Sequence, residues 1–360
     1  PASVTEIGGG PFASCVGVTS FIVEEGNEFY VSRDGVLYSV SGDVLIEYPA
    51  GRAESSYSVL ESVESIYHSA FYGSINLNSI VLPSSLRDIQ QYSFYLVPNL
   101  YSITIPSNVI TIGKYAFAMD WSLSMIEFTD ESKMTRIGFG TFAYSGIVSL
   151  TIPASITSIA QGAFEGCTSL LSISFAENSC LEYVSAYMFQ GCDNLASVIF
   201  QNGSKLNSIQ AHGFHNASAL MSIDFGDANL TNIDNYAFMY CNNLQSITLP
   251  DTLEVIGRFA FFGCSSLNEL NVPSSVEFIG RMAFNTGNKI NIYFNADLLP
   301  IYLQEDWDNG VSGYYLDVKE YGNAAKAAES VINSPAGYAL AASSNEMVAE
   351  YIYDEGSEPI

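Results

Sequence analysis

Phenylalanine recurs along this chain at a nearly constant interval, and this column constrains the fold more than any other feature. Its members are Phe12, Phe71, Phe94, Phe117, Phe142, Phe164, Phe189, Phe214, Phe238, Phe261 and Phe284. After one larger gap they lie 22 to 25 residues apart, and Ile or Val stands five residues before each. Units this short cannot each close a core, so they must stack and bury their apolar columns against their neighbours.

A second pattern follows the Phe column and predicts a strand in each unit. Six residues after most of the Phe residues begins a Leu-x-x-Ile-x-apolar segment, as in Leu100, Ile103 and Ile105. In several units a proline follows at once, as at Pro106 and Pro153. Proline has no backbone N–H, so it ends a ladder strand and turns the chain. We therefore expect one parallel strand per coil, with length variation confined to one corner.

The linked columns resemble a known repeat family. They are similar to the BspA-type, or treponemal-type, leucine-rich repeat. The similarity is seen in residues 159–164 (Ile-Ala-Gln-Gly-Ala-Phe), 165–170 (Glu-Gly-Cys-Thr-Ser-Leu) and 169–175 (Ser-Leu-Leu-Ser-Ile-Ser-Phe). The resemblance implies a horseshoe-type leucine-rich-repeat solenoid, mainly of parallel β-strands with short turns, with about 11 coils over residues 1–294. It also implies a bacterial cell-surface or secreted protein used in adhesion, with no catalytic residue and no cofactor.

Two segments interrupt the repeat. Residues 24–62 alternate apolar and polar positions around the turn residues Asp34 and Gly35, which predicts a hairpin insertion; a dedicated binding module is the alternative. Residues 295–360 lack the columns and predict an irregular, partly helical C-terminal cap, with helical spacing from Tyr321 to Ile332. The acidic clusters at 305–308 and 354–355 match no calcium loop, so we expect solvated charge there.

The charge balance excludes several classes of partner. The chain has 38 acidic against 12 basic residues and a net charge of −26. Such a surface repels phosphate backbones and anionic lipids, so we expect no nucleic-acid partner. There is no apolar run long enough to span a membrane. Nine acids and two bases fall in residues 24–64, and twelve and two in 297–358, so the acidity belongs mainly to the irregular parts.

Cysteine and histidine supply the candidate chemistry of the repeats. Five of the six cysteines stand three residues after a column Phe, where Ser, Ala or Gly stands in four other units; they are Cys15, Cys167, Cys192, Cys241 and Cys264. A site that accepts only small side chains predicts buried, free structural thiols. His212 and His215 form a possible metal pair, but no third ligand is near in the sequence, so we expect no metal site.

Aromatic residues flank the Phe column and form the candidate contact surface. Tyr92, Tyr115, Tyr187 and Tyr236 stand two residues before a column Phe. Tyr72 and Tyr95 stand one residue after a column Phe. They either pack along the outside of the stack or contact a sugar or a protein. A row of strand serines predicts a flat, weakly adhesive face without a small-molecule pocket.

The sequence thus predicts a non-enzymatic module that binds a host or microbial surface protein or glycan, located outside the cell or on its surface. The alternative is a structural spacer of a larger surface protein with no ligand of its own. An enzyme is disfavoured because a catalytic serine does not recur in eight units and has no partnered histidine.

Overall fold

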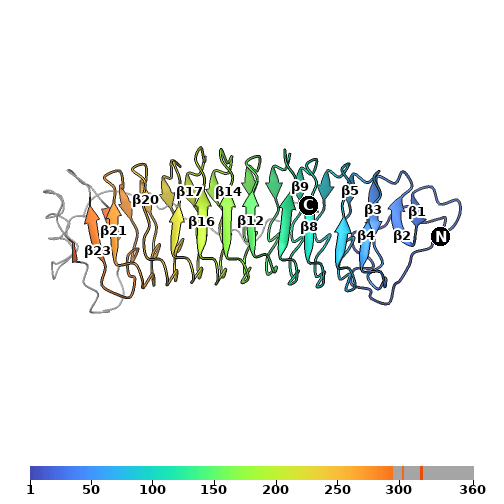
Figure 1. Ribbon diagram of the computed structural model, residues 1–360, viewed down its shortest axis with the longest axis horizontal. Helices are drawn as coiled ribbons and strands as arrows, with labels where there is room; N and C mark the ends of the chain where they lie inside the picture. Colours follow the sequence, from blue (N-terminus) through green and yellow to red (C-terminus); the bar gives the residue numbers. More distant parts are fainter. Residues whose placement is uncertain (295–301, 304–316, 319–360) are drawn as a thin grey trace.

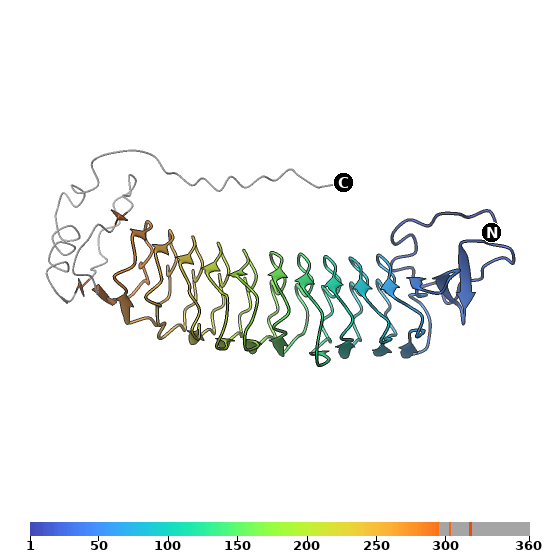
Figure 2. The same cartoon turned by 90° about the horizontal axis from the view of Figure 1, so that it is seen from above.

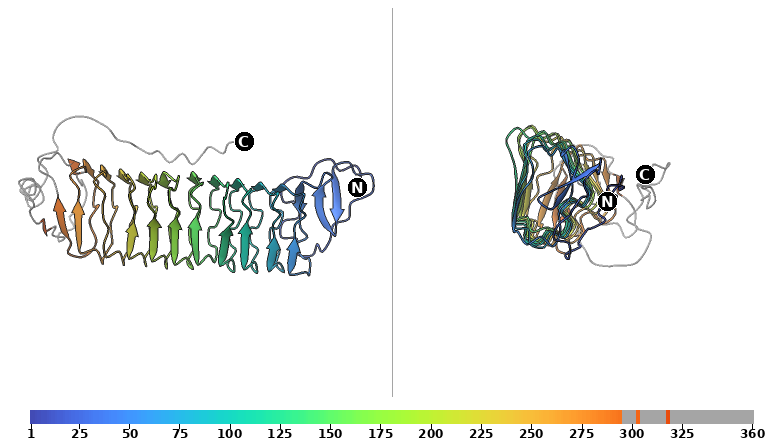
Figure 3. Two further views of the ribbon diagram at one scale, coloured as in Figure 1. Left: turned by 45° about the horizontal axis from the view of Figure 1, so that its top comes forward. Right: turned by 90° about the vertical axis from the view of Figure 1, so that its right-hand side faces the viewer.

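The computed structural model describes residues 1–294, 302–303 and 317–318. Strands are its only regular elements, and these residues contain no helix that could cross a membrane. The coils stack in sequence order into one elongated solenoid (Figures 1 and 2). Viewed along the stack, the outlines of successive coils superpose (Figure 3, right). The expected parallel β-solenoid of about 11 coils is confirmed.

Most coils contribute a longer strand to one side of the solenoid, which we call the long-strand face. Residues 245–250 form no strand, so the ladder on this face is divided into two sheets. Neighbouring strands there pair in parallel, because each coil repeats the direction of the one before it. One sheet holds β4 (Ser56–Ser58), β6 (Ser79–Val81), β8 (Ser102–Ile105), β10 (Met125–Phe128), β12 (Ser149–Ile152), β14 (Ser172–Phe175), β16 (Ser197–Phe200) and β18 (Ser222–Asp224). A second holds β21 (Glu269–Val272), β23 (Asn291–Phe294) and β25 (Asp317–Val318).

A two-residue strand in each coil builds a second set of ladders. The second residue of these strands in the repeat region is the Ile or Val that stands five before the column Phe, and it is buried. One sheet contains β5 (Ser65–Ile66), β7 (Asp88–Ile89), β9 (Thr111–Ile112), β11 (Arg136–Ile137) and β13 (Ser158–Ile159). The other contains β15 (Tyr183–Val184), β17 (Ser208–Ile209), β19 (Asn232–Ile233), β20 (Val255–Ile256), β22 (Phe278–Ile279) and β24 (Tyr302–Leu303).

The insertion at 24–62 forms the expected hairpins. β1 (Tyr30–Arg33) pairs antiparallel with β2 (Val36–Ser39), and β2 with β3 (Val44–Glu47). β3 then pairs in parallel with β5, so the insertion joins the ladder of short strands instead of standing apart from it. It therefore covers the first edge of that ladder, which would otherwise be open to pairing with another chain.

The first Phe unit differs from the expectation of a regular coil. Residues 1–29 contain no strand, and Phe12 is only half-buried. Its ring packs on Phe21, with 5.0 Å between the centroids, and not in the stack of the other column residues. The insertion explains the difference, because its hairpins and not this unit supply the neighbour of β5.

A continuous stack of phenylalanine rings forms the centre of the core. From Phe71 to Phe284, each ring stacks on the next, with centroids 4.8 to 6.1 Å apart. Ile, Leu and Val of both strand types fill the space around the stack, and one buried cluster runs from Val36 to Ile292. Burial of these apolar side chains is the main stabilising contribution.

Proline limits the pairing between some coils. Backbone N–H groups just after β10, β14 and β16 donate to the preceding coil, as from Thr129 to Ile105 at 3.1 Å. Pro153 follows β12 and has no N–H, so it cannot make this bond. β10 and β12 accordingly share only one residue pair, whereas β8 and β10 share four. Pro106 follows β8, and β6 and β8 also share one pair.

Residues 295–360 lie outside the described part of the chain apart from β24 and β25. The predicted helices of the C-terminal cap and both acidic clusters fall there, so they stay predictions.

Candidate binding surface

The turn that carries each column Phe has a left-handed residue two positions before the Phe. A second lies two positions after the Phe in every unit but the last, where Gly287 has the positive φ. In the first set all eleven residues have positive φ: Gly10, Ser69, Tyr92, Tyr115, Gly140, Gly162, Tyr187, His212, Tyr236, Phe259 and Met282. Bulky residues rarely adopt this conformation. The turn therefore holds these side chains in one orientation in every coil, which aligns them into rows along the outside of the stack.

The sequence-predicted tyrosines fall into two separate clusters. Tyr92 stacks on Tyr115 at 5.4 Å and contacts Tyr95 edge-on at 5.6 Å, and Tyr95 stacks on Tyr72 at 4.8 Å. Further along the solenoid, Tyr187 and Tyr236 stack on the two faces of His212 at 4.8 and 4.7 Å. Gly140 and Gly162 stand at the equivalent positions between the clusters, so the row of rings is interrupted there.

Glycines beside these rings support a packing role. A Cβ at Gly140 would lie 2.3 Å from Cε1 of Tyr115, and one at Gly166 would lie 2.4 Å from the ring of Tyr144. The tyrosine rings thus rest on glycine backbone of the next coil. Burial raises the pKa of Tyr92 and Tyr115, consistent with rings that are only partly solvated. Contact of these six tyrosines with a ligand stays a prediction.

Replacing Tyr92, Tyr115 and Tyr187 together by alanine separates the two roles. Each stacked pair contributes about 0.5–1.5 kcal/mol beyond its buried area, so packing predicts a loss of about 3 kcal/mol in the free energy of unfolding. The measurement is urea unfolding followed by circular dichroism. Unchanged stability together with lost ligand binding would contradict the packing role.

His212 and His215 lie close together but lack a complete set of metal ligands. Their Nδ1 atoms are 3.2 Å apart, and Nδ1 of His215 also lies 3.2 Å from Oε1 of Gln190. Burial, with a smaller effect of His215, lowers the pKa of His212 to about 4. Among the described residues no group of three metal-ligating side chains gathers. His212 stacks between Tyr187 and Tyr236, and His215 packs beside Tyr240, so both rings contact the aromatic residues on the outside of the stack.

Four of the column cysteines are buried and hydrogen-bonded, as the small-residue column predicts. The thiol of Cys167 donates to the carbonyl of Phe142 at 3.0 Å, and Cys192, Cys241 and Cys264 make the same contact with a Phe of an earlier coil. Burial raises the pKa of the Cys167 thiol to about 11. Cys15 departs from the expectation: it is exposed, in the first unit, whose Phe12 is not part of the ring stack.

We expect thiol labelling with Ellman's reagent to separate these classes. In the native protein, exposed Cys15 and half-buried Cys180 should react within minutes, and the four buried thiols at least a hundredfold more slowly. In denaturant without reductant all six should react. A total well below six would contradict the prediction of free thiols.

The outer side of the long-strand face is polar, with an apolar border. Serines share one register across β12, β14, β16 and β18, and their side chains are exposed or half-buried. Larger apolar residues stand just before β8, β12, β14 and β18. Exposed apolar side chains there are Tyr101 at 60%, Val148 at 38%, Leu171 at 52% and Met221 at 48%. Aromatic, Leu and Met side chains beside hydroxyls provide both apolar area and hydrogen-bonding groups for a protein partner.

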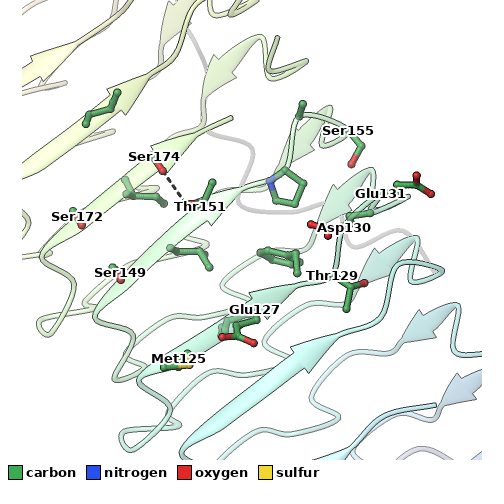
Figure 4. A pocket seen from close by; sticks show the side chains of 18 residues that line it. Met125, Glu127, Thr129, Asp130, Glu131, Ser149, Thr151, Ser155, Ser172 and Ser174 are labelled. Carbon is green, nitrogen blue, oxygen red and sulfur yellow. Dashed lines mark hydrogen bonds between the residues drawn. The ribbon is translucent and has the colours of Figure 1, made fainter. Parts of the chain in front are cut away.

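The long-strand face is not flat, contrary to the sequence-based expectation. A hollow of about 950 Å³ lies over β10, β12 and β14, and Figure 4 shows the side chains that line it. Ser149 and Ser172 lie at its strand-start end, and Thr129, Asp130 and Glu131 at the opposite end. Met125 and Glu127 of β10 lie along one side. This hollow was not predicted from the sequence, although unequal corner lengths in adjacent units indicate it.

The repeat geometry agrees with a sequence-family model that matches more than half of the chain. The model of the BspA type leucine rich repeat region matches residues 53–171 and 161–291 in six copies. The chain belongs to the BspA-type leucine-rich-repeat family. Proteins of this family have a solenoid that is typical of protein binding or structural roles and typically non-catalytic. A search of curated proteins found no match.

Among solved structures, the chain is similar to several bacterial proteins. A leucine-rich repeat protein from Eubacterium ventriosum is 22% identical, with a TM-score of 0.41; the match covers 72% of this chain and 56% of that one. The pneumococcal vaccine antigen PcpA is 17% identical, with a TM-score of 0.43 and 79% and 86% covered. A leucine rich cell surface protein from Faecalibacterium prausnitzii is 22% identical, with a TM-score of 0.38 and 74% and 86% covered.

Proposed function

We propose that this BspA-type chain is a non-enzymatic, protein-binding adhesion module of a bacterial surface or secreted protein. The observation that carries the proposal is the outer side of the long-strand face, where a serine ladder, an exposed apolar border and the hollow lie together. Membership of a family of bacterial surface proteins supports a location outside the cell. A host or microbial surface protein is the partner that this face fits best, and a glycan is the second.

A structural spacer is the alternative role. The unbroken core from Val36 to Ile292 supports it, because such a stack behaves as one stiff rod. A spacer needs no exposed apolar border, whereas a binding face does, so the border at Tyr101, Leu171 and Met221 favours binding.

The test combines a binding panel with two variants. The full chain is measured by biolayer interferometry against immobilised fibronectin and collagen, and on a glycan array. Ser172→Arg places a long side chain on β14 within the long-strand face, and Asn207→Arg places the same side chain just before the short strand β17. We expect Ser172→Arg to weaken binding at least tenfold and Asn207→Arg less than twofold. Equal effects, or no partner in the panel, would favour the spacer.

A further inference from the structure

The hollow on the long-strand face has its origin in unequal corner lengths of adjacent coils. From Phe128 to Met134 the chain takes six steps, and in the next coil, from Ile152 to Ile156, it takes four. Residues 129–132 therefore form a wall, and residues 153–155 a lower floor beside it. Because the two coils lie next to each other in the stack, the difference in length leaves an open space on the surface.

The same proline that shortens the corner also loosens the sheet beneath the hollow. Pro153 cannot donate to the preceding coil, and only Met125 and Ser149 pair between β10 and β12. β12 and β14 again share four pairs. The later parts of β10 and β12 are therefore not held together by a full ladder, and this is where the hollow lies (Figure 4).

Charge in the hollow is entirely negative. Glu127, Asp130 and Glu131 line it and are exposed, and no Lys, Arg or His does so. None of the three forms an ion pair within the described part of the chain. The nearest following base, Lys133, is engaged elsewhere, since its Nζ donates to Oδ1 of Asn108 at 2.8 Å. The carboxylates are therefore available to a cationic partner.

Polar and apolar groups complete the lining. Met125 and Ile199 are 45% and 42% exposed, and Ser149 and Ser172 present hydroxyls. The Oγ atom of Ser155 is buried in the floor and has no hydrogen-bond partner among the described residues.

We propose that this hollow binds an extended, lysine- or arginine-bearing segment of a partner protein. The proposal rests on the proposed protein-binding function and specifies the chemistry of the partner. The cationic side chains lie against Glu127, Asp130 and Glu131, and intervening residues contact Met125, Ile199 and the serine hydroxyls. Charge complementarity selects the segment and its orientation, because Asp130 and Glu131 lie at one end of the hollow and Glu127 lies along one side of it.

The test uses a defined peptide and two matched triple variants of the full chain. The probe is a fluorescein-labelled octapeptide of alternating Lys and Thr, followed by fluorescence anisotropy in 50 mM salt. One variant combines Glu127→Gln, Asp130→Asn and Glu131→Gln. The control combines Asp251→Asn, Glu254→Gln and Glu277→Gln, which remove the same charge from exposed positions of later coils. We expect the hollow variant to bind at least tenfold more weakly and the control to change less than twofold.

Two further arms make each outcome decisive. An octapeptide with Glu in place of Lys should not bind, and urea unfolding should show that both triple variants keep the stability of the parent. Equal weakening by the two variants would overturn the proposal, because the peptide would then respond only to the net charge of −26. If the peptide does not bind but a panel protein still binds in a Ser172-dependent manner, the proposal fails and the protein-binding function stands.

Discussion

Replacing Phe164 by alanine is expected to destabilise the solenoid by about 3–5 kcal/mol, the usual cost of removing a fully buried aromatic ring. Phe164 is 0% exposed and stacks between Phe142 and Phe189, with centroids 5.3 and 5.6 Å away. The alanine leaves a cavity at the middle of the stack, where both neighbouring coils lose contacts. The measurement is urea unfolding followed by circular dichroism.

The stack also predicts the shape of the unfolding curve. Each coil contacts mainly its neighbours, so a cavity between two coils weakens the coupling of the two halves of the solenoid. We expect the variant to unfold in a broader or two-step transition. The control is Phe139→Ala, because Phe139 is 37% exposed on the outside of the stack. A similar loss in both variants would contradict the central role of the ring stack.

Replacing Glu47 by glutamine is expected to stabilise the protein above pH 7. Glu47 is 2% exposed, and its Oε2 has no hydrogen-bond partner among the described residues. Burial raises its pKa from 4.5 to about 8. At pH 7 the folded carboxyl stays protonated while the unfolded one ionises, which costs about 3 kcal/mol of stability. Glutamine removes this cost because it does not ionise. The net gain in stability is smaller by about 1 kcal/mol, because the buried amide N–H groups need hydrogen-bond partners.

The sign of the pH dependence follows from the raised pKa. The buried carboxyl of Glu47 does not lower the free energy of unfolding below pH 4.5, where it is protonated in both states. The destabilisation grows from pH 4.5 to about pH 8 and is constant at higher pH. Urea unfolding at pH 4, 6 and 8 should therefore show a gain for Glu47→Gln at pH 8 and none at pH 4. Exposed Glu61→Gln is the control and should show no such trend. A constant difference across pH would contradict the assignment.

Asp120 illustrates a residue whose role could not be predicted from its pattern. It occupies the small-side-chain column that holds cysteine in four buried coils, yet it is completely buried. Its Oδ1 accepts from the backbone N–H of Val97 at 2.6 Å, a bond between two coils. Burial raises its pKa well above the ordinary value. A column assigns a position to the interior, but the partner of a polar side chain depends on the backbone of the neighbouring coil.

The sequence by itself determined the solenoid, the register of its strands and the content of its core. These follow from spacing, because a unit of 22 to 25 residues with aligned apolar columns has only its neighbours to pack against. The hairpins at 24–62 were also predictable from Asp34 and Gly35, since that dipeptide favours a tight turn.

Only the tertiary structure decided how neighbouring coils differ where they touch. The hollow arises from the corner at 129–132 standing beside the shorter corner at Pro153. The separation of Tyr92 and Tyr115 from Tyr187 depends likewise on which residue follows in the next coil. The repeated columns show what all coils have in common. A binding surface depends instead on differences in side chain and corner length between adjacent coils, which lie a few ångströms apart. Unequal corner lengths can be read from the sequence, but the hollow between the corners appears only when the coils are placed side by side.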